Sequence, residues 1–155
     1  MGQQQLLLLV LGIVIVGLAV VVGIQAFSEN QQKANLDAMV NDGVRIASDL
    51  QAWSLKPQAF GGPAAGTTDP WTTADFGDLG YELGGNGCAA TEYGNLNGCY
   101  TLAAGVITAE GGPGADPNNN RVRIDVGGTS PGDIQTQTAA DGTPPSAPAA
   151  PATTT

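Results

Sequence analysis

Residues 6–24, LLLLVLGIVIVGLAVVVGI, decide how the rest of the chain can be organised. These nineteen residues include no charge and no proline, and fifteen of them are Leu, Ile or Val. Each such side chain favours the centre of a bilayer by roughly 0.3–0.6 kcal/mol on insertion scales. At ~1.5 Å per residue a helix of this length just spans a hydrocarbon core of about 30 Å. We therefore expect the segment to lie in lipid or in a bundle of identical segments.

The overall composition excludes several functional classes. The 155 residues hold 14 acidic and 5 basic side chains and no histidine, for a net charge of −9. So few scattered bases cannot neutralise a row of phosphates, and we expect no nucleic-acid binding. The chain also has no glycine-rich phosphate loop and no nucleophile signature, and we expect neither an enzyme nor a cofactor.

The helix that begins in the apolar segment is expected to continue to Trp53. Residues 27–53 contain no proline, and Pro57 marks the stop. Apolar side chains recur there mostly every three to four residues, at Leu36, Met39, Val40, Ile46, Ala47, Leu50 and Trp53. Polar residues fall mostly between them, at Asp37, Asn41, Asp42, Arg45, Ser48 and Asp49. The second half of the helix is therefore amphipathic and should pack on a small soluble domain.

Residues 57–140 predict that small domain, which is rich in loops. Residues 100–108 are typical of a strand, residues 121–126 alternate apolar and polar side chains, and residues 133–138 repeat this pattern more weakly. Connectors rich in Gly, Pro and Asn favour turns between them, and a short helical turn is expected near residues 73–79. The predicted fold class is α+β, with a long N-terminal helix packed on a small antiparallel meander.

These boundaries divide the chain into four parts. They are the apolar helix segment 1–28, its amphipathic continuation 29–56, the globular part 57–140 and a Pro/Ala/Thr-rich tail 141–155. The tail cannot build a core, so it should be extended and dispensable for folding. Its candidate O-glycan acceptors are Thr143, Ser146, Thr153, Thr154 and Thr155.

The two cysteines, Cys88 and Cys99, both follow the apolar segment. If that segment crosses a membrane, they lie outside the cytosol, where a disulfide persists. A bridge between them would contribute roughly 3 kcal/mol in the chain-entropy model. We expect the bridge, with two buried free thiols as the alternative.

One stretch superficially resembles the start of a calcium loop. It runs from Asp116 to Asn120, but the sixth position is Arg121 rather than glycine and the twelfth is Gly127 rather than glutamate. We expect a plain turn there and no metal site.

Taken together, the uncharged apolar N-terminal segment, the continuous amphipathic helix, the small antiparallel sheet and the cysteine pair resemble a type IV pilin. The resemblance implies a structural subunit of an extracellular helical filament with a surface role such as adhesion or motility. It implies residence in the inner (cytoplasmic) membrane before assembly, and handling by a pilus assembly machinery. The filament core would then be formed by Leu6, Leu7, Leu8, Leu9, Val10, Leu11, Ile13, Val14, Ile15, Val16, Leu18, Val20, Val21, Val22 and Ile24.

The N-terminus departs from the pilin pattern in two ways. Mature pilins typically carry glutamate at the fifth position, where this chain has Gln5, if Met1 is the mature start. A neutral amide can accept a hydrogen bond from an ammonium group but cannot cancel its charge. No basic leader precedes Met1. Either the numbering begins at the mature residue, or Met1-Gly2 is the leader and a terminal Gln3 could cyclise to pyroglutamate.

The helix-breaking proline of the family is also missing from the apolar segment. Gly17 and Gly23 are the positions where this helix could unwind locally.

The alternative function is a single-pass membrane anchor that carries an exported domain of unknown binding role. Such an anchor needs flanking basic residues to set its topology, and these are missing next to residues 6–24. It needs neither a rigid amphipathic extension nor the glutamine triplet at residues 3–5. A cleaved signal peptide fits less well, because no positive region precedes the apolar segment. We therefore favour the filament subunit.

Overall fold

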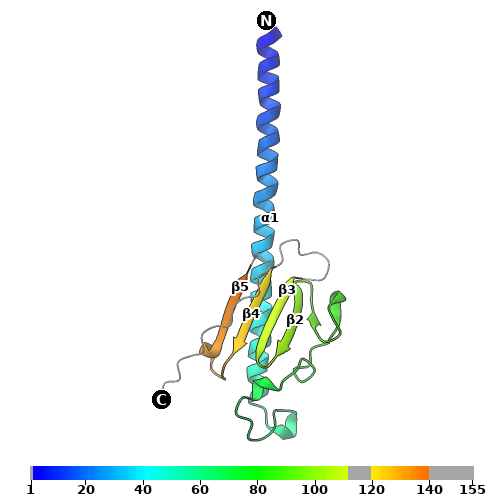
Figure 1. The fold of residues 1–155 in the computed structure, drawn as a ribbon, viewed down its shortest axis with the longest axis vertical. Helices are drawn as coiled ribbons and strands as arrows, with labels where there is room; N and C mark the ends of the chain where they lie inside the picture. The colour runs from blue at the N-terminus through cyan, green and yellow to red at the C-terminus, as the bar shows by residue number, and fades with distance from the viewer. Residues whose placement is uncertain (1, 112–119, 140–155) are drawn as a thin grey trace. The chain divides into compact units, whose positions relative to one another are not determined.

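A computed structural model describes residues 2–111 and 120–139 of the chain (Figure 1). It begins with a single long helix and ends with a sheet, which confirms the predicted α+β class. Two compact units make up the chain, Met1–Ala34 and Asn35–Thr155. The elements in order are α1 (Gly2–Ser54), the 3-10 helices η1 (Gln58–Phe60), η2 (Pro70–Thr72) and η3 (Gly85–Gly87), strands β1 (Tyr93–Gly94), β2 (Gly98–Ala103), β3 (Val106–Gly111) and β4 (Arg121–Val126), the 3-10 helix η4 (Pro131–Asp133), and strand β5 (Ile134–Ala139).

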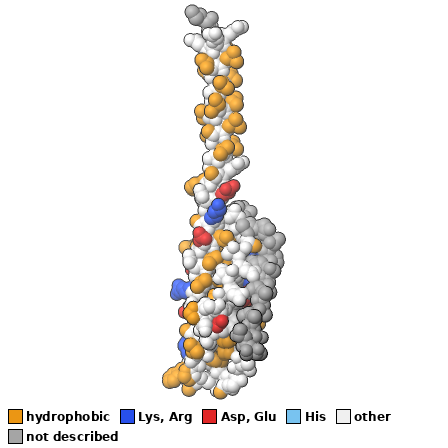
Figure 2. Space-filling model, turned by 90° about the vertical axis from the view of Figure 1, so that its left-hand side faces the viewer, with side chains coloured by type: hydrophobic (Ala, Val, Ile, Leu, Met, Phe, Trp, Pro, Cys, Tyr) orange, Lys and Arg blue, Asp and Glu red, His pale blue; other side chains and the backbone are white. Residues whose placement is uncertain are grey.

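The first unit is helical throughout the residues that the structure describes in it. Helix α1 runs without a break through Gly17 and Gly23 and ends at Ser54, as the position of Pro57 predicts. Every residue from 2 to 31 is exposed to solvent in the single chain. Figure 2 shows hydrophobic side chains over the N-terminal part of α1, with no charged side chain among them on the visible face. This helix is long and apolar enough to cross a membrane.

The sheet is a five-stranded antiparallel meander in the order β1-β2-β3-β4-β5. Strands β4 and β5 confirm the two strands predicted near residues 121–126 and 133–138. The single strand predicted over residues 100–108 is wrong, because the chain reverses there into β2 and β3. The reversal occurs at Ala104 and Gly105, with φ angles of 51° and 78°. Alanine rarely adopts a positive φ, so the sequence lacks the Asn-Gly signal of such a turn.

The core of the second unit lies between one face of this sheet and the end of α1. Its buried helix residues are Met39, Ile46, Ala47, Leu50 and Trp53, and its buried strand residues are Tyr100, Ile107, Ala109, Val122, Ile124 and Val126. This confirms the apolar stripe that the sequence predicts. At Gly43 the helix lies so close to the sheet that an added Cβ would clash with the side chain of Ile124.

The loop region between α1 and the sheet is held by local bonds. The Nε1 of Trp53 donates to the carbonyl of Gly61 at 2.9 Å, which folds the chain back after the helix. The helical turn predicted near residues 73–79 is displaced to η2, and the chain then continues in turns. Cys88 and Cys99 form the predicted disulfide, with their Cα atoms 5.6 Å apart. This bridge ties the end of η3 to β2.

Candidate functional site

The apolar residues predicted to form the filament core all lie in the first unit. Their side chains are between 51% (Val10) and 71% (Leu7) exposed in the single chain. Gln5 lies in the same exposed helix. The candidate glycan acceptors, and residues 116–119 of the calcium-like stretch, lie outside the described residues.

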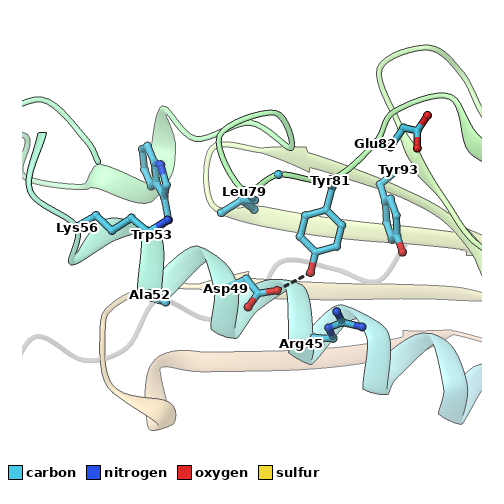
Figure 3. Close-up of a pocket in the computed structure, with 10 residues that line it drawn as sticks. Arg45, Asp49, Ala52, Trp53, Lys56, Leu79, Tyr81, Glu82 and Tyr93 are labelled. Atoms are coloured by element: carbon cyan, nitrogen blue, oxygen red, sulfur yellow. Dashed lines mark hydrogen bonds between the residues drawn. The ribbon is translucent and has the colours of Figure 1, made fainter. Parts of the chain in front are cut away.

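A pocket of about 450 Å³ lies in the second unit, between the end of α1 and the loop that follows η2. Its floor is one face of the helix, where Arg45, Asp49 and Ala52 stand at positions i, i+4 and i+7. Lys56 follows just after the last turn. The loop wall consists of Leu79, Gly80, Tyr81 and Glu82, and Tyr93 of β1 and Trp53 complete the lining. Figure 3 shows Arg45 and Lys56 at opposite ends of the floor, with Asp49 between them.

Tyr81 joins the two sides of this pocket. Its hydroxyl donates to Oδ2 of Asp49 at 2.5 Å, as Figure 3 shows. Its ring packs edge-on against Tyr93, with 4.7 Å between centroids, and against Phe76, with 5.9 Å. Burial, and then the hydrogen bond and charge of Asp49, raise the pKa of Tyr81 well above its ordinary value. The hydroxyl therefore stays protonated at neutral pH, and the aromatic wall is held in place by a bond to the helix.

The pocket holds two basic side chains, Arg45 and Lys56, that form no ion pair with any residue that the structure describes. Two ion pairs form between described residues: Arg121 with Glu110 at 3.1 Å, and Arg123 with Asp125 at 2.7 Å. No described carboxylate lies within ion-pair distance of Arg45. The same holds for Lys56. Asp49 and Glu82 line the same pocket, so its lining carries two basic and two acidic side chains.

A second polar cluster surrounds Asp42 and ties α1 to the β1–β2 connection. Its Oδ2 accepts hydrogen bonds from Nδ2 of Asn95 at 2.8 Å and from Nδ2 of Asn97 at 2.7 Å. The hydroxyl of Tyr100 donates to the same oxygen at 3.2 Å. Three donors converge on one oxygen, which fixes the helix against the edge of the sheet. This arrangement is a structural clamp, because its groups are already satisfied by one another.

A group with metal-ligand side chains does not offer a metal site. Cys88, Cys99 and Glu92 lie close together, but both sulfur atoms are used by the disulfide. A disulfide sulfur lacks the thiolate charge that binds metals. The Oε2 of Glu92 also accepts a hydrogen bond from the amide of Ala89 at 3.0 Å.

No protein-family model, no curated protein and no solved structure matches this chain. The class must therefore be taken from the fold, which is an α+β domain whose helix continues into an exposed apolar segment. A long apolar N-terminal helix, an antiparallel sheet and a disulfide are compatible with a pilin-like fold.

Neither the pocket nor the clamp was predicted from the sequence. Asp42, Arg45 and Asp49 were expected only as polar residues that fall mostly between the apolar positions of the helix. The sequence does contain a signal for the clamp, because Asp42 stands three residues after buried Met39 and four before buried Ile46. A polar residue at that spacing borders the apolar stripe and needs a partner.

Proposed function

We propose that this protein is the structural subunit of a type IV pilus-like helical filament on the cell surface. The N-terminal segment of α1 holds the subunit in the cytoplasmic membrane before assembly and packs against copies of itself afterwards. The pilus assembly machinery moves it from one environment to the other. The proposal covers a structural and surface role, not catalysis.

The observation that carries this proposal is the continuous exposure of residues 6–24 within helix α1. Fifteen large apolar side chains there are more than half exposed, on all sides of the helix. Water around so much apolar surface is unfavourable by roughly 25 cal/mol for each Å². Lipid or other copies of the helix must therefore cover it. The amphipathic continuation, which packs on a small disulfide-bridged domain, favours a building block over a simple anchor.

Assembly exchanges one apolar environment for another, so the hydrophobic gain between the two is small. Close packing of helices must then decide the outcome, and small residues permit such packing. The glycines of the segment suit this role, because a Cβ added at Gly17 would meet no atom of the described chain within 4 Å. A larger side chain at Gly17 would therefore leave the subunit itself undisturbed and act only on contacts with other molecules.

The first test is electron microscopy of material sheared from the cell surface, with mass spectrometry of the N-terminus. We expect filaments built from this chain, and we expect Gly17→Leu to reduce them strongly while the protein still reaches the membrane. Ile15→Asp should abolish filaments, because every copy would bury an unpaired carboxylate at a cost of several kcal/mol. In lipid a single such residue costs roughly 2.5–3.5 kcal/mol and can shift toward the interface.

Ile15→Leu is the matched control, because it keeps volume and polarity and should assemble normally. Protein that stays in the membrane and yields only monomers in detergent, under every growth condition, would contradict the filament. The single-pass anchor would then be the better explanation, and Gly17→Leu would be harmless.

A further inference from the structure

The chain contains two Asn-Gly pairs, Asn86-Gly87 and Asn97-Gly98. Asparagine is a thermolabile residue, because its side-chain amide can be lost to water. A following glycine favours this loss, since glycine has no Cβ to hinder the approach of its backbone nitrogen to the asparagine side chain. Both pairs lie among the described residues, so their surroundings can be compared directly.

The reaction requires two groups to be free at the same time. The backbone nitrogen of the glycine loses its proton and attacks Cγ of the asparagine, which forms a cyclic succinimide. The bond from Cγ to Nδ2 breaks, and the side-chain nitrogen takes up a proton and leaves as ammonia. Water then opens the ring at either carbonyl and gives aspartate or isoaspartate. Hydrogen bonds that hold the glycine amide or the asparagine side chain therefore oppose the reaction.

The pair Asn97-Gly98 is held at both reacting groups. Nδ2 of Asn97 donates to Oδ2 of Asp42 at 2.7 Å, and the amide of Gly98 donates to Oδ1 of Asn95 at 3.0 Å. The carbonyl of Asn97 also accepts a hydrogen bond from Nδ2 of Asn35 at 3.2 Å. Gly98 is buried and begins β2, which pairs with β3. The attack would require several of these bonds to open together, so the clamp protects this pair.

The pair Asn86-Gly87 lacks these restraints. Both residues are exposed, and both belong to the short 3-10 helix η3. The amide of Cys88 donates to the carbonyl of Gly85 at 3.1 Å, and this bond uses neither reacting group. Within the described part of the chain, the side chain of Asn86 has no hydrogen-bond partner. The amide of this side chain can therefore turn toward the backbone that follows it.

The backbone around Asn86 also favours local opening. Asn86 has a φ of 53° and a ψ of 29°, a left-handed conformation that glycine alone adopts freely. Gly84, Gly85 and Gly87 surround it in the sequence, so no neighbouring side chain hinders rotation. Rotation about ψ of Asn86 carries the nitrogen of Gly87 toward Cγ. Exposed turns of this kind open at a small fraction of the free energy of global unfolding.

We propose that Asn86 is a deamidation site of the folded protein, whereas Asn97 is protected by the clamp at Asp42. The reactant is water, and the products are ammonia and an acidic residue at position 86. This inference goes beyond the filament proposal and does not depend on it.

The conversion changes the surface beside the disulfide. Each event adds one negative charge to a chain whose net charge is −9. Isoaspartate also lengthens the backbone within η3. This helix packs so closely on β1 that a Cβ added at Gly94 would clash with the carbonyl oxygen of Gly85. Old subunits should therefore differ from new ones in charge and in the local backbone of η3.

Peptide mapping by mass spectrometry tests the proposal on the whole chain in detergent. The folded protein is incubated in mildly alkaline buffer, which favours loss of the glycine amide proton, and the converted fraction at each asparagine is followed over time. We expect Asn86 to convert at least tenfold faster than Asn97. Enzymatic methylation of isoaspartate should label the peptide that contains residue 86.

The same chain, unfolded in urea with its disulfide reduced, is the matched control, because both pairs then lose their surroundings. The two rates should agree within threefold there. Equal rates at Asn86 and Asn97 in the folded chain would overturn the proposal. It would also be overturned if folding slowed the conversion of Asn86 at least tenfold.

A substitution in the folded chain tests the protection of Asn97. Asn95→Ala removes the acceptor of the Gly98 amide, so the rate at Asn97 should rise at least fivefold. The rate at Asn86 should stay within twofold of the original. An unchanged rate at Asn97 in a variant that circular dichroism shows to be folded would contradict protection by the clamp.

Discussion

Replacing Asp42 with alanine should markedly destabilise the second unit without touching its hydrophobic core. The carboxylate accepts hydrogen bonds from Asn95, Asn97 and the hydroxyl of Tyr100. Alanine would leave three donors without their acceptor. The helix would also lose its polar connection to the β1–β2 edge of the sheet.

The expected size of the effect follows from the burial of each donor. Tyr100 is fully buried, so its unpaired hydroxyl should cost the full ~1–3 kcal/mol of a desolvated donor. Asn95 and Asn97 are half-buried, so water can replace part of their bonds. Together we expect Asp42→Ala to lower the free energy of unfolding by about 3 kcal/mol. For a unit of this size that corresponds to a drop of roughly 10 °C in Tm.

Urea unfolding followed by circular dichroism measures this loss, with Asp37→Ala as the matched control. Asp37 is an exposed acid on the same helix, and its replacement should change stability by less than about 0.5 kcal/mol. In a double-mutant cycle, Asp42→Ala and Tyr100→Phe should be less than additive by at least ~1 kcal/mol. If Asp42→Ala is as mild as the control, or if the two changes simply add, the clamp does not exist as described.

Two further predictions concern the disulfide and the buried tyrosines. Replacing Cys88 and Cys99 together by serine should cost about 3 kcal/mol, and intact mass should show the native protein without alkylatable thiols. Two reactive thiols in the native protein would contradict the bridge. Burial raises the pKa of Tyr81 and Tyr100 above the ordinary value of ~10, so the unfolded chain loses these protons first. Stability should hold below about pH 10 and fall above it, and Tyr100→Phe should lessen the fall. A urea midpoint that does not change between neutral and strongly alkaline pH would refute this.

The elements that the sequence predicted well are those with a strong local pattern. A charge-free apolar segment and apolar residues spaced every three to four positions predicted α1 and its buried stripe, because burial follows the helical period. The alternation of Val122, Ile124 and Val126 predicted β4 for the same reason. The spacing of the two cysteines and the expected export of the domain predicted the disulfide, because a domain with a small core outside the cytosol is often stabilised by such a bridge.

The elements that the sequence did not predict depend on distant contacts or on unusual backbone angles. The turn at Ala104 uses a positive φ that alanine seldom adopts, and the hairpin was therefore taken for a single strand. The pocket forms because a loop some thirty residues later in the chain folds over α1. A contact between such distant segments produces no local periodicity in the sequence. The clamp at Asp42 likewise joins residues 53, 55 and 58 positions apart.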